Sequence, residues 1–367
     1  MLAYIVRRLL LIVPTLLGIM ALNFLVVQIV PGGPVDQVLS KIQGSGVDVT
    51  ARVSGNDSGE LQQSGSQGGE GQAGSYRGAQ GLDPDFIKEL ERQYGLDKPW
   101  YERFGTMVWN YARFDFGESY FRDETVIGLI LEKMPVSISL GLWTTLLTYL
   151  IAIPLGIRKA VHDGSTFDIW TSGVVIVGNA VPSFLFAILL IVLFAGGSFL
   201  DWFPLRGLTS EGWHQLSLFD KVVDYFWHLA LPLTALMIGA FAYLTMLTKN
   251  SFIDQINMQY VQTARAKGLT ESRVLYGHVF RNAMLIVIAG FPGAFIGILF
   301  TGSMLIEIIF SLDGLGLLGY EAALKRDYPV MFASLYMFGL LGLVVQLITD
   351  LTYVLIDPRI DFETREA

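Results

Sequence analysis

The chain has 367 residues, of which 52% are hydrophobic and only 16% are charged, and its mean hydropathy is +0.50. An ordinary soluble domain carries about 25% charged residues, so this composition excludes a soluble globular protein. The sequence contains no cysteine, which excludes disulfides, thiolate catalysis and cysteine-ligated metal sites. Its formal net charge of −8 argues against a nucleic-acid-binding protein.

Six apolar stretches are long enough to cross a bilayer, which takes about 20 residues of helix. The predicted spans cover residues 9–30, 136–157, 171–195, 227–247, 283–306 and 331–353. They contain no lysine or arginine, and their single acidic residue is Asp350. The first stretch follows Arg7 and Arg8 and is longer than the core of a signal peptide, so we expect a retained anchor.

Charge predicts the orientation of these spans. With the N-terminus inside, the inner segments hold 11 basic and 8 acidic residues, whereas the outer segments hold 14 basic and 24 acidic residues. Because basic residues in short loops stay on the cytoplasmic side, we expect both termini to be cytoplasmic.

The outer segment 31–135 divides by composition. Residues 43–80 are rich in Gly, Ser and Gln and predict a flexible insertion, with a partner contact as the weaker alternative. Residues 82–133 predict amphipathic helices, one from Asp83 to Gly95 and one over 100–116. These helices suit either the membrane interface or a docking platform for a soluble partner, and both readings stay open.

Several kinds of chemistry are missing from the sequence. No Gly-Lys dipeptide occurs, so there is no phosphate-binding loop of the Walker type, and no HExxH or GxSxG motif is present. We therefore expect no catalytic residue and no metal site. Asp350 lies seven residues before Asp357, about 10 Å along a helix and so near the inner interface, and we expect it to pair with a nearby basic side chain, with a role in transport as the alternative. Few other ionisable groups lie at depth, which argues against an ion-driven carrier.

Polar, proline and glycine residues inside the spans allow kinks and close helix approach. The residues that we assign to the transport pathway or to helix packing are Asn179, Pro182, Pro292, Gly293 and Gly297.

The longest inner segment, 249–282, contains the sequence YVQTARAKGLTESRV from Tyr260 onward. Residues 259–267 predict a short helix, Gly268 suits a left-handed helix end, and Thr270 can cap a second short helix. The small residues Thr263, Ala264 and Ala266 would let the first helix enter a groove of a partner. Arg265 and Lys267 would then offer positive charge to an acidic rim. The alternative is that these basic residues only obey the positive-inside rule.

This loop resembles the coupling-helix region of ABC importer permeases, whose signature is E-A-A-x-x-x-G. The second Ala and the Gly fall on Ala264 and Gly268, whereas Gln262 and Thr263 replace the first two positions, as in the oligopeptide/dipeptide subfamily. Further matching runs are Tyr4-Ile5, Arg7-Arg8, Pro31-Gly32, Tyr94-Gly95-Leu96-Asp97, Arg281-Asn282-Ala283, Glu307, Phe310-Ser311, Gly314-Leu315-Gly316, Arg326-Asp327-Tyr328-Pro329 and Asp357-Pro358-Arg359-Ile360. The outer insertion followed by Tyr76-Arg77-Gly78 is similar to that of Yej-type permeases.

The resemblance implies an all-α integral membrane protein, a six-helix type I ABC importer permease bundle of the bacterial inner membrane. It further implies a second homologous permease, a cytoplasmic ATPase that binds ATP and Mg, and a periplasmic peptide-binding protein. The expected cargo is oligopeptides, including peptide-nucleotides like microcin C. Coupling to the ATPase is assigned to Tyr260, Thr263, Ala264, Arg265, Lys267 and Gly268. The alternative is a stand-alone secondary transporter or channel for peptides.

The expected organisation has four parts. Residues 1–30 form the N-terminal end and first span, and 31–135 form the periplasmic segment. Residues 136–356 form a five-helix core that contains the coupling loop 249–282, and 357–367 form a cytoplasmic tail.

Overall fold

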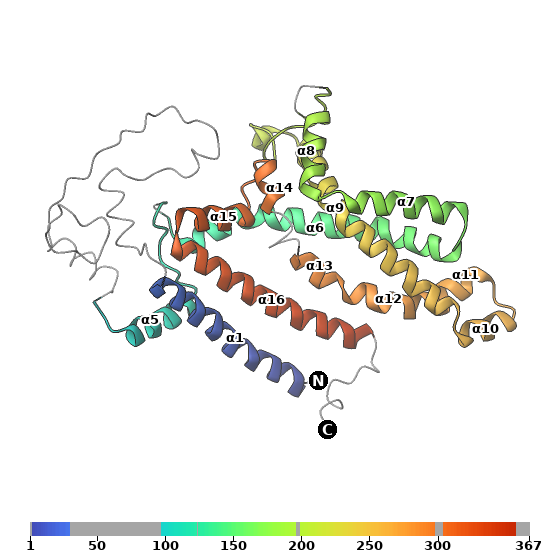
Figure 1. Cartoon of the computed structure of the whole chain (residues 1–367), viewed down its shortest axis with the longest axis horizontal. Coiled ribbons are helices and arrows are strands. Elements are labelled where there is room, and N and C mark those ends of the chain that lie inside the picture. The colour runs from blue at the N-terminus through green and yellow to red at the C-terminus, as the bar shows by residue number, and fades with distance from the viewer. Residues whose placement is uncertain (1, 30–96, 123, 196–198, 298–303, 357–367) are drawn as a thin grey trace, which may run out of the picture. The chain divides into compact units, whose positions relative to one another are not determined.

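The computed structural model describes residues 2–29, 97–122, 124–195, 199–297 and 304–356, and Figure 1 labels their helices. Within this part of the chain the fold is helical, apart from one isolated bridge between Glu118 and Thr125. The chain divides into two compact units. The first comprises Met1–Ile12, Ile130–Tyr320 and Met337–Ala367, and the second comprises Val13–Leu129 and Glu321–Tyr336. The expected insertion 43–80, the helix from Asp83 and the tail 357–367 lie outside the described residues.

Five helical segments are long and apolar enough to cross a membrane. They are Ile5–Val26, Val126–Val161, Leu218–Ile256, Glu271–Phe295 and Tyr328–Thr352. They belong to the helices α1 (Leu2–Ile29), α6 (Val126–Val161), α9 (Leu218–Ile256), a run from α11 (Glu271–Val274) to α13 (Phe291–Gly297), and α16 (Tyr328–Ile356). A sixth span is present if the bent pair α7 and α8 counts as one. The prediction of an all-helical membrane protein is therefore confirmed.

The predicted third span, 171–195, is not one straight helix. The chain forms α7 (Thr166–Ala180) and α8 (Ser183–Phe194), which meet at an angle of 95°. Val181 between them is extended, with φ −86° and ψ 119°, because the ring of Pro182 disfavours a helical conformation in the preceding residue. Pro182 also lacks the N–H that a continuous helix would need. An apolar run indicates that a segment is buried in lipid or protein, but it does not determine whether the helix is straight.

The spanning helices extend beyond their predicted apolar runs. α6 begins at Val126, ten residues before the predicted span at 136, so part of the expected outer segment belongs to this helix. In the region of the predicted fifth span, 283–306, the described helical run begins at Glu271 and passes through the π-helix η2 (Leu275–Val279) and α12 (Phe280–Ala289), and residues 298–303 lie outside the described residues. The backbone hydrogen bonds of a helix form whether its side chains are apolar or charged, so a helix can continue past its apolar run. The ends of a helix therefore do not mark the edge of the bilayer.

Two apolar clusters hold the first unit together. The first joins α6, α8, α9 and α14 (Met304–Ile309) through residues such as Leu140, Leu190, Leu229 and Ile306. The second cluster lies where α6, α9 and α12 meet the loop that follows α9. These clusters fix the helices that carry both the loop and the cavity described below.

The second unit contains α5 (Trp100–Ala112), within the range 100–116 for which the sequence predicts an amphipathic helix. Tyr111 at its end packs edge-on against Phe116 and Tyr336, with ring centroids 4.9 and 5.4 Å away. The carboxylate of Asp327 accepts hydrogen bonds from the Ser119 hydroxyl and from the backbone N–H of Tyr120. These contacts fasten the segment after α5 to the start of α16.

Candidate functional site

The loop after α9 folds as two short helices joined at a glycine. The first is α10 (Gln259–Ala266) and the second is α11. Gly268 between them has φ +77°, a conformation that only glycine adopts without strain. The N–H of Gly268 donates to the carbonyl of Arg265 (2.9 Å) and that of Leu269 to the carbonyl of Ala264 (3.4 Å). This is the Schellman arrangement of hydrogen bonds. We call α10, Gly268 and α11 the elbow.

One face of α10 is buried in the chain's own core. Val261 and Ala264 are 0% and 6% exposed, and they pack among Ile157 and Ala160 of α6 and Phe252 of α9. The expected stripe of small residues is therefore divided, since Ala264 faces inward. The outward face of α10 carries the exposed residues Gln262, Thr263, Ala266 and Lys267.

Three side chains of the elbow have specific partners. Arg265 makes two parallel contacts with Glu271, at 2.9 and 3.0 Å, so its guanidinium spans the bend within this chain. Arg265 remains exposed, so its expected contact with a partner's acidic rim, like that of Lys267, stays a prediction. The hydroxyl of Tyr260 donates to the side-chain amide oxygen of Gln255 (2.8 Å) and links α10 to the end of α9. Thr270 stands at the N-cap of α11 as predicted, but its side chain makes no capping hydrogen bond.

Beside the elbow lies a cluster of four charged residues, which we call the charge cluster: Lys159 of α6, Asp163 of the turn between α6 and α7, Asp168 of α7 and Lys249 of α9. The ammonium group of the fully buried Lys159 lies 3.0 Å from one carboxylate oxygen of Asp168. It also donates to the hydroxyls of Thr171 (2.8 Å) and Ser172 (2.7 Å). Lys249 lies 2.7 Å from the other oxygen of Asp168 and 2.8 Å from Asp163.

The charge cluster was not predicted from the sequence, where its residues entered only the charge count that predicts the orientation of the spans. The signal that could have found them is their position directly beside three apolar runs, because a buried lysine requires a partner. The hydroxyl of Ser251 adds a further link by donating to the carbonyl of Ala283 (2.7 Å). Lys249 thus joins α9 to Asp168 of α7, which in turn pairs with Lys159 of α6, and Ser251 joins α9 to α12.

Two motif residues outside the loop also have structural partners. Glu307 is fully buried, and its carboxylate accepts hydrogen bonds from the Ser137 hydroxyl (3.0 Å) and the backbone N–H of Leu317 (2.8 Å). A side chain at Gly314 would come within 2.6 Å of this carboxylate, which explains the glycine. Asp350 pairs with Arg8 at 2.9 Å, as the sequence predicted.

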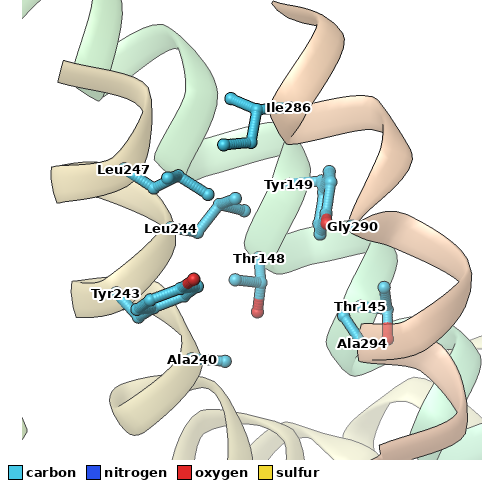
Figure 2. A pocket seen from close by; sticks show the side chains of 10 residues that line it. All are labelled: Thr145, Thr148, Tyr149, Ala240, Tyr243, Leu244, Leu247, Ile286, Gly290 and Ala294. Carbon is cyan, nitrogen blue, oxygen red and sulfur yellow. The ribbon is translucent and has the colours of Figure 1, made fainter. Parts of the chain in front are cut away.

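A cavity of about 450 Å³ opens between α6, α9, α12 and α13. Its walls are formed by Thr145, Thr148, Tyr149, Ala240, Tyr243, Leu244, Leu247, Ile286, Gly290 and Ala294. Figure 2 shows Tyr243 of α9 extending toward the space that Thr148 of α6 faces. The hydroxyl of Tyr149 donates to the carbonyl of Val287 (3.2 Å), which ties α6 to α12 at the wall.

The pathway residues expected from the sequence lie elsewhere among the described residues. Asn179 and Pro182 are exposed at the bend between α7 and α8, and Pro292, Gly293 and Gly297 belong to α13. None of these five lines the cavity. Proline and glycine mark bends, whereas the cavity is formed by ordinary residues whose proximity depends on how the helices cross. Within the described residues, no group of three His, Asp or Glu side chains could hold a metal ion.

Comparison with known proteins gives consistent matches. Residues 152–362 match the family model described as binding-protein-dependent transport system inner membrane component. The chain is 64% identical over 366 residues to the peptidoglycan transport system permease protein YejB of Agrobacterium fabrum, covering 100% of both chains. It is 56% identical over 365 residues to the inner membrane ABC transporter permease protein YejB of Escherichia coli O157:H7, covering 99% of this chain and 100% of that protein.

A more distant relative is the oligopeptide transport system permease protein AppB of Bacillus subtilis. It is 33% identical over 363 residues, which cover 99% of this chain and 100% of that protein. Among solved structures, an inward-facing form of the MetNI methionine ABC transporter covers 63% of this chain and 97% of its own chain, with a TM-score of 0.49 and 15% identity.

Proposed function

This chain belongs to the family of inner membrane components of binding-protein-dependent transport systems, and we propose that it forms half of the pathway of an ATP-driven oligopeptide importer. It is a multi-pass permease of the inner membrane and not the ATPase of its system. A transporter of this kind also comprises an ATPase, a binding protein and a partner permease. In our proposal the partner permease is homologous to this chain, and the binding protein delivers peptides from the periplasm.

We infer the substrate class from the relatives. Full-length relatives are named for transport of peptidoglycan and of oligopeptides. Short peptides, including the peptide fragments of peptidoglycan, are the substrate class that both names cover. Peptide-nucleotides such as microcin C are the further cargo that the Yej-type resemblance suggests. The binding protein would supply most of the selectivity.

The observation that carries the coupling mechanism is the two-faced helix α10. Its inner face is packed into the same apolar cluster as α6, α9 and α12, whereas Gln262, Thr263, Ala266 and Lys267 face outward. A partner that moves this outer face must therefore move the helices on which the inner face rests. We propose that closure of the ATPase acts on this face and shifts the population between two arrangements of the bundle.

Gly268 has a defined part in this proposal. It holds the bend between α10 and α11 at φ +77°, and the Arg265–Glu271 pair spans the same bend. A rigid bend transmits a displacement, whereas a loose one would absorb it. Tyr260 passes the displacement to the end of α9 through Gln255.

A cross-linking experiment tests this assignment, and the absence of native cysteine makes it direct. Single Thr263→Cys and Lys267→Cys variants, assembled with the ATPase, should form cross-links to it whose yield changes when ATP is bound. A Trp170→Cys variant is the control, since Trp170 is 77% exposed on α7 and is not part of the elbow. The coupling assignment is wrong if neither elbow variant reaches the ATPase in a complex that hydrolyses ATP.

The same preparation separates the importer from a stand-alone carrier. An importer should take up peptide into proteoliposomes only when the ATPase, the binding protein and ATP are all present. Uptake by this chain alone would contradict the proposal.

A further inference from the structure

Two hydroxyl groups in the wall of the cavity are buried without a hydrogen-bond partner among the described residues. Thr145 and Thr148 of α6 are 1% and 2% exposed, and the oxygen of neither side chain is bonded. They lie one turn apart on the same helix, so both can face one occupant. Both line the cavity, and Figure 2 shows the Thr148 hydroxyl among its walls.

Thr145 and Thr148 belong to a group of five buried threonines whose hydroxyls have no hydrogen-bond partner among the described residues, the others being Thr144, Thr245 and Thr248; of the five, only these two line the cavity. A threonine inside a helix ordinarily satisfies its hydroxyl by donating to the carbonyl four residues earlier. Thr234 does this to Ala230 (2.7 Å), and Thr349 does it to Val345 (2.8 Å). Because a buried polar group without a partner is costly, the hydroxyls of Thr145 and Thr148 indicate that something polar meets them during function.

The remaining wall is apolar and partly open. Leu244, Leu247 and Ile286 offer aliphatic surface, and Ala240 and Ala294 leave room beside it. Tyr243 also lines the cavity and is 72% exposed, so its ring is not part of the core. A volume of about 450 Å³ lies in the range of ligand sites, roughly 300–1,000 Å³.

We propose that this cavity is a subsite for the peptide in transit. The hydroxyls of Thr145 and Thr148 hydrogen-bond one amide group of the peptide backbone, and the aliphatic wall takes the adjoining side chain. Tyr243, also in the wall, selects for the size of that side chain. The subsite rests on the proposed function as a peptide permease, and it assigns part of the selectivity to this chain.

Removal of one hydroxyl tests the polar part of the subsite. The complete complex with Thr148→Val should take up trialanine and trileucine about two- to tenfold more slowly at limiting concentration, the effect of losing one hydrogen bond. Thr148→Ser should restore uptake, because it keeps the hydroxyl. The matched control is Thr144→Val. The Thr144 hydroxyl is equally buried and without a partner, but it does not line the cavity.

Thiol modification tests the apolar part, again with this cysteine-free chain. Coupling a bulky thiol reagent to Tyr243→Cys should reduce uptake of trileucine more than uptake of trialanine. The control is Val174→Cys, since Val174 is 70% exposed on α7 and does not line the cavity. Unsubstituted complex treated with the same reagent accounts for thiols on the other subunits.

The outcomes separate the subsite from the function on which it rests. If Thr148→Val and Thr144→Val behave alike, and modified Tyr243→Cys behaves like modified Val174→Cys, the subsite is wrong although peptide uptake persists. If the unsubstituted complex hydrolyses ATP in response to the binding protein but takes up neither peptide, the proposed function itself is wrong.

Discussion

The elbow and the charge cluster lie in the same unit of the molecule, but their ion pairs differ in burial and in the distance along the chain between the paired residues. The bend of the elbow is spanned by a pair between near neighbours in sequence, Arg265 with Glu271, whose side chains are 43% and 72% exposed. The charge cluster joins three helices, and its central residues Lys159 and Asp168 are buried, with side chains 0% and 7% exposed. The ion pair across the bend can therefore be removed with little cost in stability, whereas the charge cluster ties α6, α7 and α9 together.

The largest effect is expected from Asp168→Ala, which leaves Lys159 and Lys249 without their shared carboxylate. Loss of one partner of a buried ion pair costs about 3–5 kcal/mol, so little folded protein should remain in the membrane. Thermal unfolding of the purified complex measures this. Asp163→Ala is the control, because the Asp163 side chain is 55% exposed. Equal stability of the two variants would contradict the difference between the regions.

A smaller cost but a full loss of function is expected from Gly268→Val. A left-handed conformation in a residue with a side chain costs about 1–2 kcal/mol, so the protein should still insert and assemble. Peptide uptake in proteoliposomes should be abolished, because the bend between α10 and α11 changes. Gly268→Asn should keep most of the uptake, since asparagine tolerates this conformation. Normal uptake by the valine variant would overturn the role of the bend.

An intermediate effect is expected where the two regions adjoin. Ser251→Ala removes the hydrogen bond from α9 to the Ala283 carbonyl of α12 and should lower stability by about 0.5–1.5 kcal/mol. Chemical denaturation of the complex measures the change, and Ser251→Thr, which keeps a hydroxyl, should recover most of it. If alanine and threonine have the same effect, the hydroxyl is not what joins the helices.

The smallest effect is expected from the ion pair across the elbow. A double-mutant cycle with Arg265→Ala and Glu271→Ala should yield a coupling energy of about 0.2–1 kcal/mol, since both side chains are substantially exposed. The same cycle measured on ATP-driven uptake should show a larger coupling if the pair keeps the bend rigid. If this coupling energy were as large as the loss of stability in Asp168→Ala, the exposed ion pair and the buried charge cluster would not differ in their contribution to stability.

Much of the local structure could be predicted from the sequence. The short helix before Gly268, its left-handed end and the position of Thr270 follow from backbone preferences of adjacent residues, and the structure confirms each of them. The pairing of Asp350 with a basic residue was also predicted, because an acidic group in an apolar run needs a partner.

The predictions that failed concern direction and proximity. Ala264 was expected on the outer face and is buried, because the orientation of α10 depends on the cluster beneath it. The third span bends at Pro182, although its apolar run is continuous. The cavity is lined by other residues than the five assigned to the pathway or to helix packing, and that assignment stays a prediction.

The sequence by itself determined that this is a multi-span helical membrane protein with a bent loop between its fourth and fifth spans. Hydropathy and backbone preference are properties of contiguous residues, so no other part of the chain is needed to recognise them. Only the tertiary structure decided which charges meet around Lys159, which face of α10 is turned outward, and which residues line a common cavity. Those features join residues from separate helices, and their positions follow from how the helices pack and cross.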